Sequence, residues 1–232
     1  MKLLGRILVA YYLGFHILAF VLFVPYVTRR SNYAKNLRSD GVSPAWWGFF
    51  SAMSSFNDLG YTLNATSMAL FDESAYVQLI SGAFILIGNT AFPICLRFII
   101  WLMKHFTKPL TLSHDSLSFL LDHPRRCFTL LFPSGPTWWL FAVLLLLNFL
   151  DWILFIILDF GREGLSYIPR GYQILCGLYQ AICTRTAGFN VVNLASLNPA
   201  IQVSYMVMMY ISVLPLAISI RRTNVYEEQS LG

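Results

Sequence analysis

The segment "AICTRTAGFNVVNL", residues 181–194, is short and half polar, in a chain that is otherwise mostly Leu, Ile, Phe and Trp. It brings an Arg, two Thr and a Gly close together, and apolar sequence flanks it on both sides. A polar segment in such surroundings needs water or an ion near its backbone, because lipid satisfies no hydrogen bond. The fold expected for the chain follows from where this segment lies.

The composition of the 232-residue chain is that of an integral membrane protein. It is 57% hydrophobic and 12% charged, whereas soluble domains are about 45–50% apolar and about 25% charged. The net charge of +5 comes from basic residues that lie mostly between apolar runs, which favours lipid headgroups over nucleic acid as partners. The four cysteines form no CxxC pair, and we expect Cys176 and Cys183 to be buried free thiols.

Four apolar runs are long enough to cross a bilayer, which takes about 20 residues. The expected spans are 7–27, 76–103, 136–158 and 200–220. The second is long and is expected to tilt. Two shorter segments, 44–63 and 171–192, start apolar and turn polar at a Gly. Their length suits a re-entrant helix and not a span.

The order long, short, long therefore occurs twice in the chain. A shift of 128 residues aligns Gly60 with Gly188 and Tyr61 with Phe189, and brings the first span onto the third. Repeats of this kind are common in transport proteins. We therefore predict an all-α integral membrane protein with a first helix–pore-loop–helix unit at 1–104, a connecting loop at 105–135 and a second unit at 136–232.

The basic residues predict that the connecting loop is cytoplasmic. If each unit crosses twice, this loop shares a side with the N-terminal end and with the region after the last span. That side carries Lys2, Arg6, Lys104, Lys108, Arg125, Arg126, Arg221 and Arg222, and the positive-inside rule makes it cytoplasmic. The other side also carries basic residues, which weakens the difference in positive charge between the two sides. They are Arg29, Arg30, Lys35 and Arg38. Asn64-Ala65-Thr66 is a glycosylation sequon on that outer side.

The two short segments have the features of an ion filter. A helix that ends inside the membrane leaves carbonyl groups unpaired, which only a water-filled or ion-filled cavity accepts. Backbone carbonyls can replace the hydration shell of a cation, the helix C-terminus adds partial negative charge, and a Gly lets the backbone approach the ion. "FNDLGY", 56–61, and "TRTAGF", 184–189, are therefore interpreted as filter strands. The alternative is a pair of surface turns with ordinary Gly C-caps.

Four stretches also resemble the Trk/Ktr/HKT superfamily of potassium and sodium transporters, most closely the fungal Trk potassium transporters. They are "SSFNDLGYTL", "GNTAFPICLRFIIW", "CTRTAGFNVVNL" and "VSYMVMMYISVLPLAISIRRTNVYEEQSLG". The resemblance covers the whole chain and implies a pore of four helix–pore-loop–helix units, of which this chain is similar to the second and third. It implies Gly60 and Gly188 as filter glycines and potassium uptake at the plasma membrane, with sodium as an alternative ion. No cofactor, no metal beyond the transported ion and no enzymatic activity are implied.

The expected filter consists of Asp58, Leu59, Gly60, Tyr61, Thr186, Ala187, Gly188 and Phe189. Asp58 either raises the cation concentration at the pore mouth or supports the loop by accepting backbone N–H bonds. Arg185 is expected to point away from the ion and to pair with a carboxylate or with backbone carbonyls. Pro93 and Pro215 are candidate kinks or gates.

Three residues with acidic, basic or imidazole side chains fall within the expected spans. Asp151 is either functional or neutral and hydrogen-bonded to a neighbouring helix. We expect Arg97 to reach the cytoplasmic headgroups and His16 to make an interhelical hydrogen bond.

Two filter strands do not encircle an ion. The chain ends at "EEQSLG" without an obvious domain end, which favours a fragment of a longer transporter. Otherwise a second copy of the chain completes the pore. A truncated, non-conducting membrane protein or an assembly subunit is a rival interpretation. A membrane-embedded enzyme is a remote one, because His114, Asp115 and His123 show no metal spacing and no nucleophile motif.

Overall fold

The computed structural model describes residues 2–108, 111–159, 161, 165, 168–211 and 214–222, and the regular structure within them is entirely helical. The end of the stretch "VSYMVMMYISVLPLAISIRRTNVYEEQSLG", from residue 223 on, lies outside these residues. The chain divides into two compact units. The unit that contains the connecting region, residues 1–12, 91–145 and 213–232, is called the loop unit. The unit that contains both expected filter strands, residues 13–90 and 146–212, is called the filter unit.

Long apolar helices occupy the expected first and third spans. They are α1 (Lys2–Arg29) and α8 (Ser134–Asp159), and both are long and apolar enough to cross a membrane. The fourth expected span is covered by α10 (Pro199–Ile211) and α11 (Leu214–Arg222), which together pass the same test. Pro215 is the second residue of α11, and residues 212–213 lie outside the described part of the chain. An all-α membrane protein is therefore confirmed.

The second expected span is not one tilted helix. The structure has α4 (Ala75–Gly88) and α5 (Phe92–Phe106), with residues 89–91 between them. Pro93 lies in the first turn of α5, where a missing N–H is tolerated. Proline has no N–H to bond to the carbonyl four residues earlier, so the hydrogen bonds of a helix cannot continue unbroken through this position. The expectation of a continuous helix over 76–103 is corrected accordingly.

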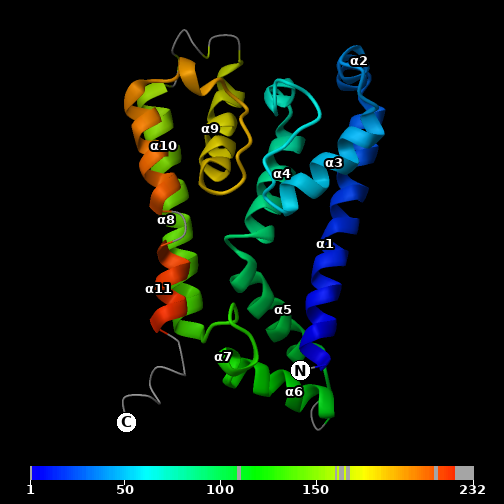
Figure 1. The fold of residues 1–232 in the computed structure, drawn as a ribbon, viewed down its shortest axis with the longest axis vertical. Coiled ribbons are helices and arrows are strands. Elements are labelled where there is room, and N and C mark those ends of the chain that lie inside the picture. Colours follow the sequence, from blue (N-terminus) through cyan, green and yellow to red (C-terminus); the bar gives the residue numbers. More distant parts are fainter. Residues whose placement is uncertain are drawn as a thin grey trace. The chain divides into compact units, whose positions relative to one another are not determined.

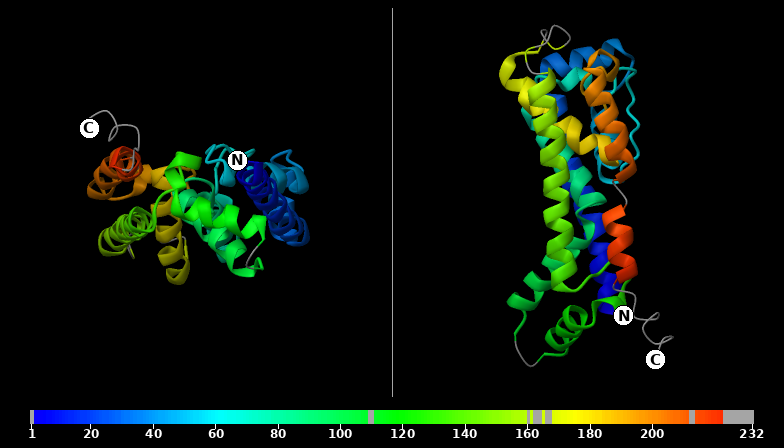
Figure 2. Two further views of the ribbon diagram at one scale, coloured as in Figure 1. Left: turned by 90° about the horizontal axis from the view of Figure 1, so that it is seen from below. Right: turned by 90° about the vertical axis from the view of Figure 1, so that its left-hand side faces the viewer.

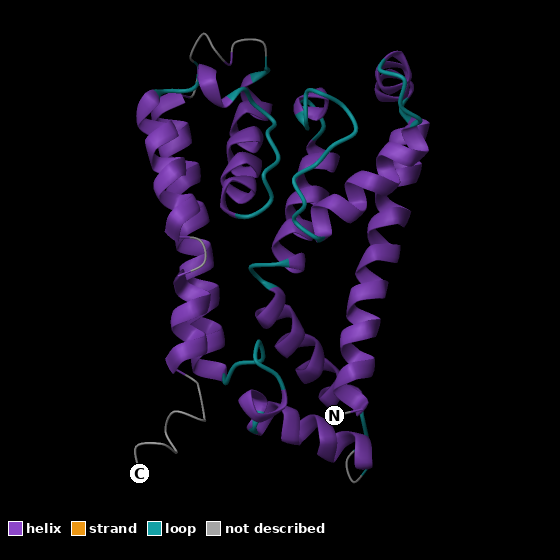
Figure 3. Cartoon of the chain, viewed as in Figure 1, coloured by secondary structure: helices purple, strands orange, loops and turns teal. Residues whose placement is uncertain are grey.

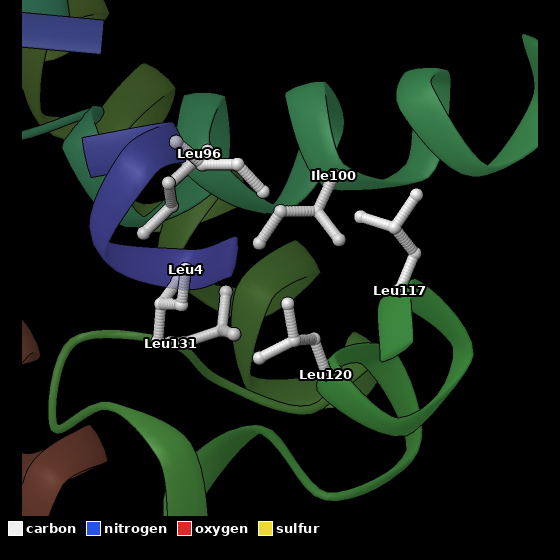
Figure 4. Packing of buried hydrophobic residues seen from close by; sticks show 7 residues of the cluster. Leu4, Leu96, Ile100, Leu117, Leu120 and Leu131 are labelled. Atoms are coloured by element: carbon white, nitrogen blue, oxygen red, sulfur yellow. The ribbon is translucent and has the colours of Figure 1, made fainter. Parts of the chain in front are cut away.

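The loop unit has its own apolar core. The connecting region, expected as a loop, contains α6 (Leu112–Asp122) and α7 (Pro124–Cys127). The Thr111 side chain caps α6 by accepting a hydrogen bond from the His114 N–H at 3.3 Å. Figure 4 shows leucine and isoleucine side chains from α1, α5 and α6 packed together with Leu131. Burial of these side chains holds α6 against α5.

The filter unit is built around two short helices, α3 (Pro44–Phe56) and α9 (Arg170–Arg185). They occupy the segments expected to be re-entrant, and each is followed by a non-helical loop, drawn in teal in Figure 3. In this unit α3 packs against α4, α4 against α9, and α9 against α10 (Figure 1). Helix α2 (Ser31–Ser39) packs against α3, and α10 lies beside α8 (Figures 1 and 2). Two short 3-10 helices, η1 (Ala69–Phe71) and η3 (Leu194–Ser196), complete the unit.

The contact between α3 and α4 leaves no room for a side chain at Gly88. A Cβ there would collide with the Phe56 carbonyl oxygen, a backbone atom that cannot rotate away. Gly88→Ala is therefore expected to destabilise the protein by about 1–3 kcal/mol, seen as a lower Tm in detergent. The control is Gly14→Ala, because a Cβ at Gly14 meets nothing within 4 Å and Ala favours the helix. An unchanged Tm for Gly88→Ala would contradict the packing of α3 on α4.

Candidate ion-selectivity filter

The helices α3 and α9 deliver the two expected filter strands. Pro44 starts α3 in the first turn, where proline is favoured. At the other end, Asn57 follows the helix and its N–H donates to the Met53 carbonyl at 3.0 Å. The last carbonyls of a helix have no intrahelical partners and carry partial negative charge. Both helices therefore end with an electronegative group of atoms at the start of a filter loop.

The two glycines aligned by the 128-residue shift lie against each other. Gly60 and Gly188 both have φ of +71°, in the left-handed region that favours glycine. A Cβ on Gly60 would lie 2.6 Å from the Ala187 carbonyl oxygen and 3.3 Å from the Gly188 Cα. A Cβ on Gly188 would lie 3.5 Å from the Gly60 Cα. The loops thus meet at the two positions that the sequence repeat predicts to be equivalent.

The eight expected filter residues differ in their exposure. Leu59 and Tyr61 are 50% and 71% exposed, and Gly188 is also exposed. Ala187 and Phe189 are buried, while Asp58, Gly60 and Thr186 are intermediate. The structure brings these residues to one region of the filter unit, and their contact with an ion stays a prediction.

Two hydrogen bonds to α3 fix the first loop. The Ser54 hydroxyl donates to the Tyr61 carbonyl at 2.8 Å, and the Ser54 carbonyl accepts from the Leu59 N–H at 3.0 Å. One serine therefore holds the backbone on both sides of Gly60.

The second loop is held by the first loop and by its own helix. The Asn190 carbonyl accepts from the Met68 N–H at 3.0 Å, and the Asn190 N–H donates to the Ser67 hydroxyl at 3.2 Å. Within the second loop, the Gln180 amide oxygen accepts from the Val191 N–H at 3.2 Å. Sequence reasoning missed Ser67 and Gln180. Gln180 is a polar residue between apolar neighbours in the sequence. That pattern indicates a buried amide with a hydrogen-bond partner, and it was the available signal.

A buried chain of hydroxyl groups links the helices behind the loops. Ser55 on α3 and Ser81 on α4 share a hydrogen bond of 2.9 Å, and Ser81 and Tyr179 on α9 share one of 3.0 Å. All three residues are buried, so their hydroxyl groups are satisfied by one another. These hydrogen bonds connect α3 and α9 through α4 and so fix the spacing between the two helices.

Among the residues that the structure describes, no backbone N–H donates to the Asp58 carboxylate. Its carboxylate lies near the side chains of Thr186 and Asn89, and within the described residues neither oxygen accepts a hydrogen bond of good geometry. The interpretation that Asp58 supports the loop through backbone N–H groups is therefore wrong. Its influence on cations at the pore mouth stays a prediction.

Arg185 and Asp151 are buried residues with side chains of opposite charge, and within the described residues they form no ion pair closer than 4.0 Å. Arg185, the last residue of α9, is 8% exposed, and Asp151 on α8 is 0% exposed. The two interact electrostatically, and the Ser204 hydroxyl on α10 donates to Asp151 Oδ1 at 3.3 Å. The hydrogen bond to α10 agrees with the prediction that Asp151 is bonded to a neighbouring helix. That Arg185 points away from the ion and pairs with a carboxylate or with backbone carbonyls stays a prediction.

His16, the two cysteines of α9 and the sequon residue Asn64 all lie in the filter unit. The His16 ring Nε2 on α1 and the Asn57 side-chain amide lie 2.9 Å apart. The expected hydrogen bond of His16 is therefore present, with a partner that directly follows α3. Cys176 and Cys183 are buried and free, as expected. The sequon residue Asn64 is 5% exposed, and its oxygen accepts from the Trp47 indole N–H at 2.9 Å. A buried, hydrogen-bonded amide is not accessible, so we expect no glycan at Asn64.

Comparison with known proteins gives whole-chain matches. The TrkH family model, described as "Cation transport protein", matches residues 1–232. The chain is 62% identical over 232 residues to the low-affinity potassium transport protein of Saccharomyces cerevisiae. The aligned region covers all of this chain and 26% of that relative. The chain is 56% identical over 231 residues to Potassium transporter TRK1 of Candida albicans, 22% of that relative. It is 46% identical to Potassium transport protein 1 of Schizosaccharomyces pombe, 28% of that relative. The chain thus spans about a quarter of the length of these curated relatives.

Proposed function

We propose, from the premise that this chain belongs to the TrkH family of cation transport proteins, that it carries two units of a potassium-conducting pore. The observation that supports this most directly is the contact between Gly60 and Gly188, which share φ of +71° at the ends of two short helices. The names of the relatives, all potassium transport proteins, supply the ion.

In the proposed mechanism, potassium gives up its hydration shell to backbone carbonyls around the two glycines. The C-terminal ends of α3 and α9 add partial negative charge there. Inward movement is driven by the membrane potential, which is worth about 2.3 kcal/mol per charge per 100 mV. The filter proposed for this chain is Asp58, Leu59, Gly60, Tyr61, Thr186, Ala187, Gly188 and Phe189.

This mechanism forms and breaks no covalent bond, so we propose a transporter without enzymatic activity, placed in the plasma membrane. Two strands leave a filter incomplete. The remaining strands are proposed to come from other segments of a longer transporter, with a second copy of this chain as the alternative. Sodium is the alternative ion, and glycine at both filter positions favours potassium.

The proposal is tested with a chimera. The matching segment of the Saccharomyces low-affinity potassium transport protein, 62% identical to this chain, is replaced by this chain and expressed in yeast that lacks potassium uptake. We expect growth on low potassium and rubidium uptake comparable to that of the unaltered relative. The chain alone is expressed in parallel, and its uptake would indicate that a second copy completes the pore. A chimera and a chain that both reach the plasma membrane and transport nothing would overturn the proposal.

A further inference from the structure

A groove on the loop unit combines aromatic walls with one cationic end. It lies between α5 and α8, and its volume is about 400 Å³. Its walls include Phe98 and Trp101 from α5 and Trp138 and Phe141 from α8. Trp138, Phe98 and Trp101 are 70%, 57% and 52% exposed. Exposed aromatic side chains of a membrane protein are positioned to contact lipid, and these four lie around one groove.

Arg97 supplies the charge in this groove. Its Nη1 donates to the Phe132 carbonyl at 2.7 Å, which uses one of the five N–H donors of the guanidinium. Asp122 interacts electrostatically with Arg97, and within the described residues the two form no close ion pair. The guanidinium is therefore fixed in direction while it keeps donors for an anion. The prediction that Arg97 reaches lipid headgroups is refined in this way.

The net charge of the loop unit, which contains the groove, favours an anionic occupant. The loop unit contains nine of the basic residues of the chain and four acidic ones, whereas the filter unit contains seven of each. The whole net charge of the chain thus comes from the loop unit. Lys104 lies seven residues after Arg97 on α5, so the two share a helix face. Tryptophans near such residues are typical of the membrane–water interface.

We infer that this groove binds an anionic phospholipid of the cytoplasmic leaflet, with its phosphate at Arg97 and an acyl chain against the aromatic walls. The cytoplasmic leaflet carries the anionic lipids that basic residues attract. Guanidinium groups match phosphate geometry through paired N–H donors. The lipid phosphate complements Arg97, and the acyl chain covers apolar surface that water would otherwise contact. This site is independent of the proposed ion filter.

The test is lipid retention, measured by native mass spectrometry on delipidated protein with added phosphatidylserine or phosphatidylcholine. Arg97→Gln keeps an N–H donor for the Phe132 carbonyl and removes the charge. We expect it to weaken phosphatidylserine binding about tenfold, the loss of a charged hydrogen bond, and to leave phosphatidylcholine binding unchanged. Arg126→Gln, a change of the same charge in α7 away from the groove lining, is the matched control. It should bind both lipids as the unaltered chain does.

A second variant keeps the test independent of Arg97. Ser134 lines the groove and is exposed, so Ser134→Trp fills the groove without a change of charge and should also lower phosphatidylserine retention. Inorganic phosphate is added as a competitor, and displacement of lipid at equal concentration would show a free-anion site instead. Equal retention in Arg97→Gln, Ser134→Trp and the unaltered chain would overturn the inference. So would absence of retention in the full-length chimera, where another segment would then cover the groove.

Discussion

Gly60→Ala is expected to lower rubidium uptake by the chimera at least about tenfold, equivalent to about 1.4 kcal/mol or more. The new Cβ would lie 2.6 Å from the Ala187 carbonyl oxygen, and Gly60 has φ of +71°. An L-residue in that region is strained by about 1–2 kcal/mol. Either the first loop leaves its dihedral angles or the Ala187 carbonyl turns away. In both cases a proposed ion ligand is displaced, so uptake should fall while membrane insertion is retained.

Gly188→Ala separates these two causes. Gly188 has the same φ, but a Cβ there would be 3.5 Å from the Gly60 Cα, which is an ordinary contact. It should therefore reduce uptake less than Gly60→Ala does. Gly14→Ala, in α1 with open space around it, is the control for expression and should transport normally. Uptake by Gly60→Ala equal to that of the control, at equal surface expression, would contradict the proposed filter geometry.

The difference between the two glycines could not be obtained from the sequence. The 128-residue repeat predicts that Gly60 and Gly188 are equivalent, and their equal φ values agree with it. The two positions differ in the space around them. A Cβ on Gly60 would collide with the Ala187 carbonyl oxygen, and Ala187 is far from Gly60 in the sequence. Sequence patterns report the dihedral requirement of a glycine, which is local, and not its neighbours in space.

The same distinction explains the other differences between expectation and structure. Long apolar runs and the short segments before Gly60 and Gly188 were predictable, because length and hydropathy alone decide them. The break before Pro93 had a local signal, yet the apolar run continues through it, and the run suggested one helix. The helix α6 had a weaker signal, since it is stabilised by packing of Leu117 and Leu120 on other helices.

Tertiary partners also decide the roles of single polar residues. Asn64 fits a glycosylation motif, but its amide is bonded to the Trp47 indole in the interior. Gln180 has no motif at all, and it fixes the Val191 N–H behind the filter. In a membrane the backbone and side-chain polar groups must find partners within the protein. A buried polar residue in such a chain is therefore better interpreted as a hydrogen-bond partner for another part of the protein than as a site of modification.

The buried charges behind the second filter strand should behave as one unit. Asp151→Asn would leave the Arg185 charge buried without its carboxylate, and Arg185→Gln would leave Asp151 in the same state. Removing one partner of a close buried ion pair costs about 3–5 kcal/mol, and these two charges are farther apart than 4.0 Å. Each single variant should therefore lose less than that and show a lower Tm in detergent. Asp115→Asn is the control, because Asp115 lies on α6 with a side chain that is 75% exposed. Its effect should stay within about 0.5 kcal/mol.

The double variant, Asp151→Asn with Arg185→Gln, decides whether the two charges are coupled. Two neutral amides leave no uncompensated charge, and the asparagine amide at position 151 would still offer an oxygen to the Ser204 hydroxyl that now donates to Asp151. The loss of stability in the double variant should therefore be smaller than the sum of the two single losses, by about 1–3 kcal/mol. Additive losses would mean that each charge is stabilised by other groups. Since Arg185 directly precedes Thr186, a coupled pair would anchor the start of the second filter strand to α8 and α10.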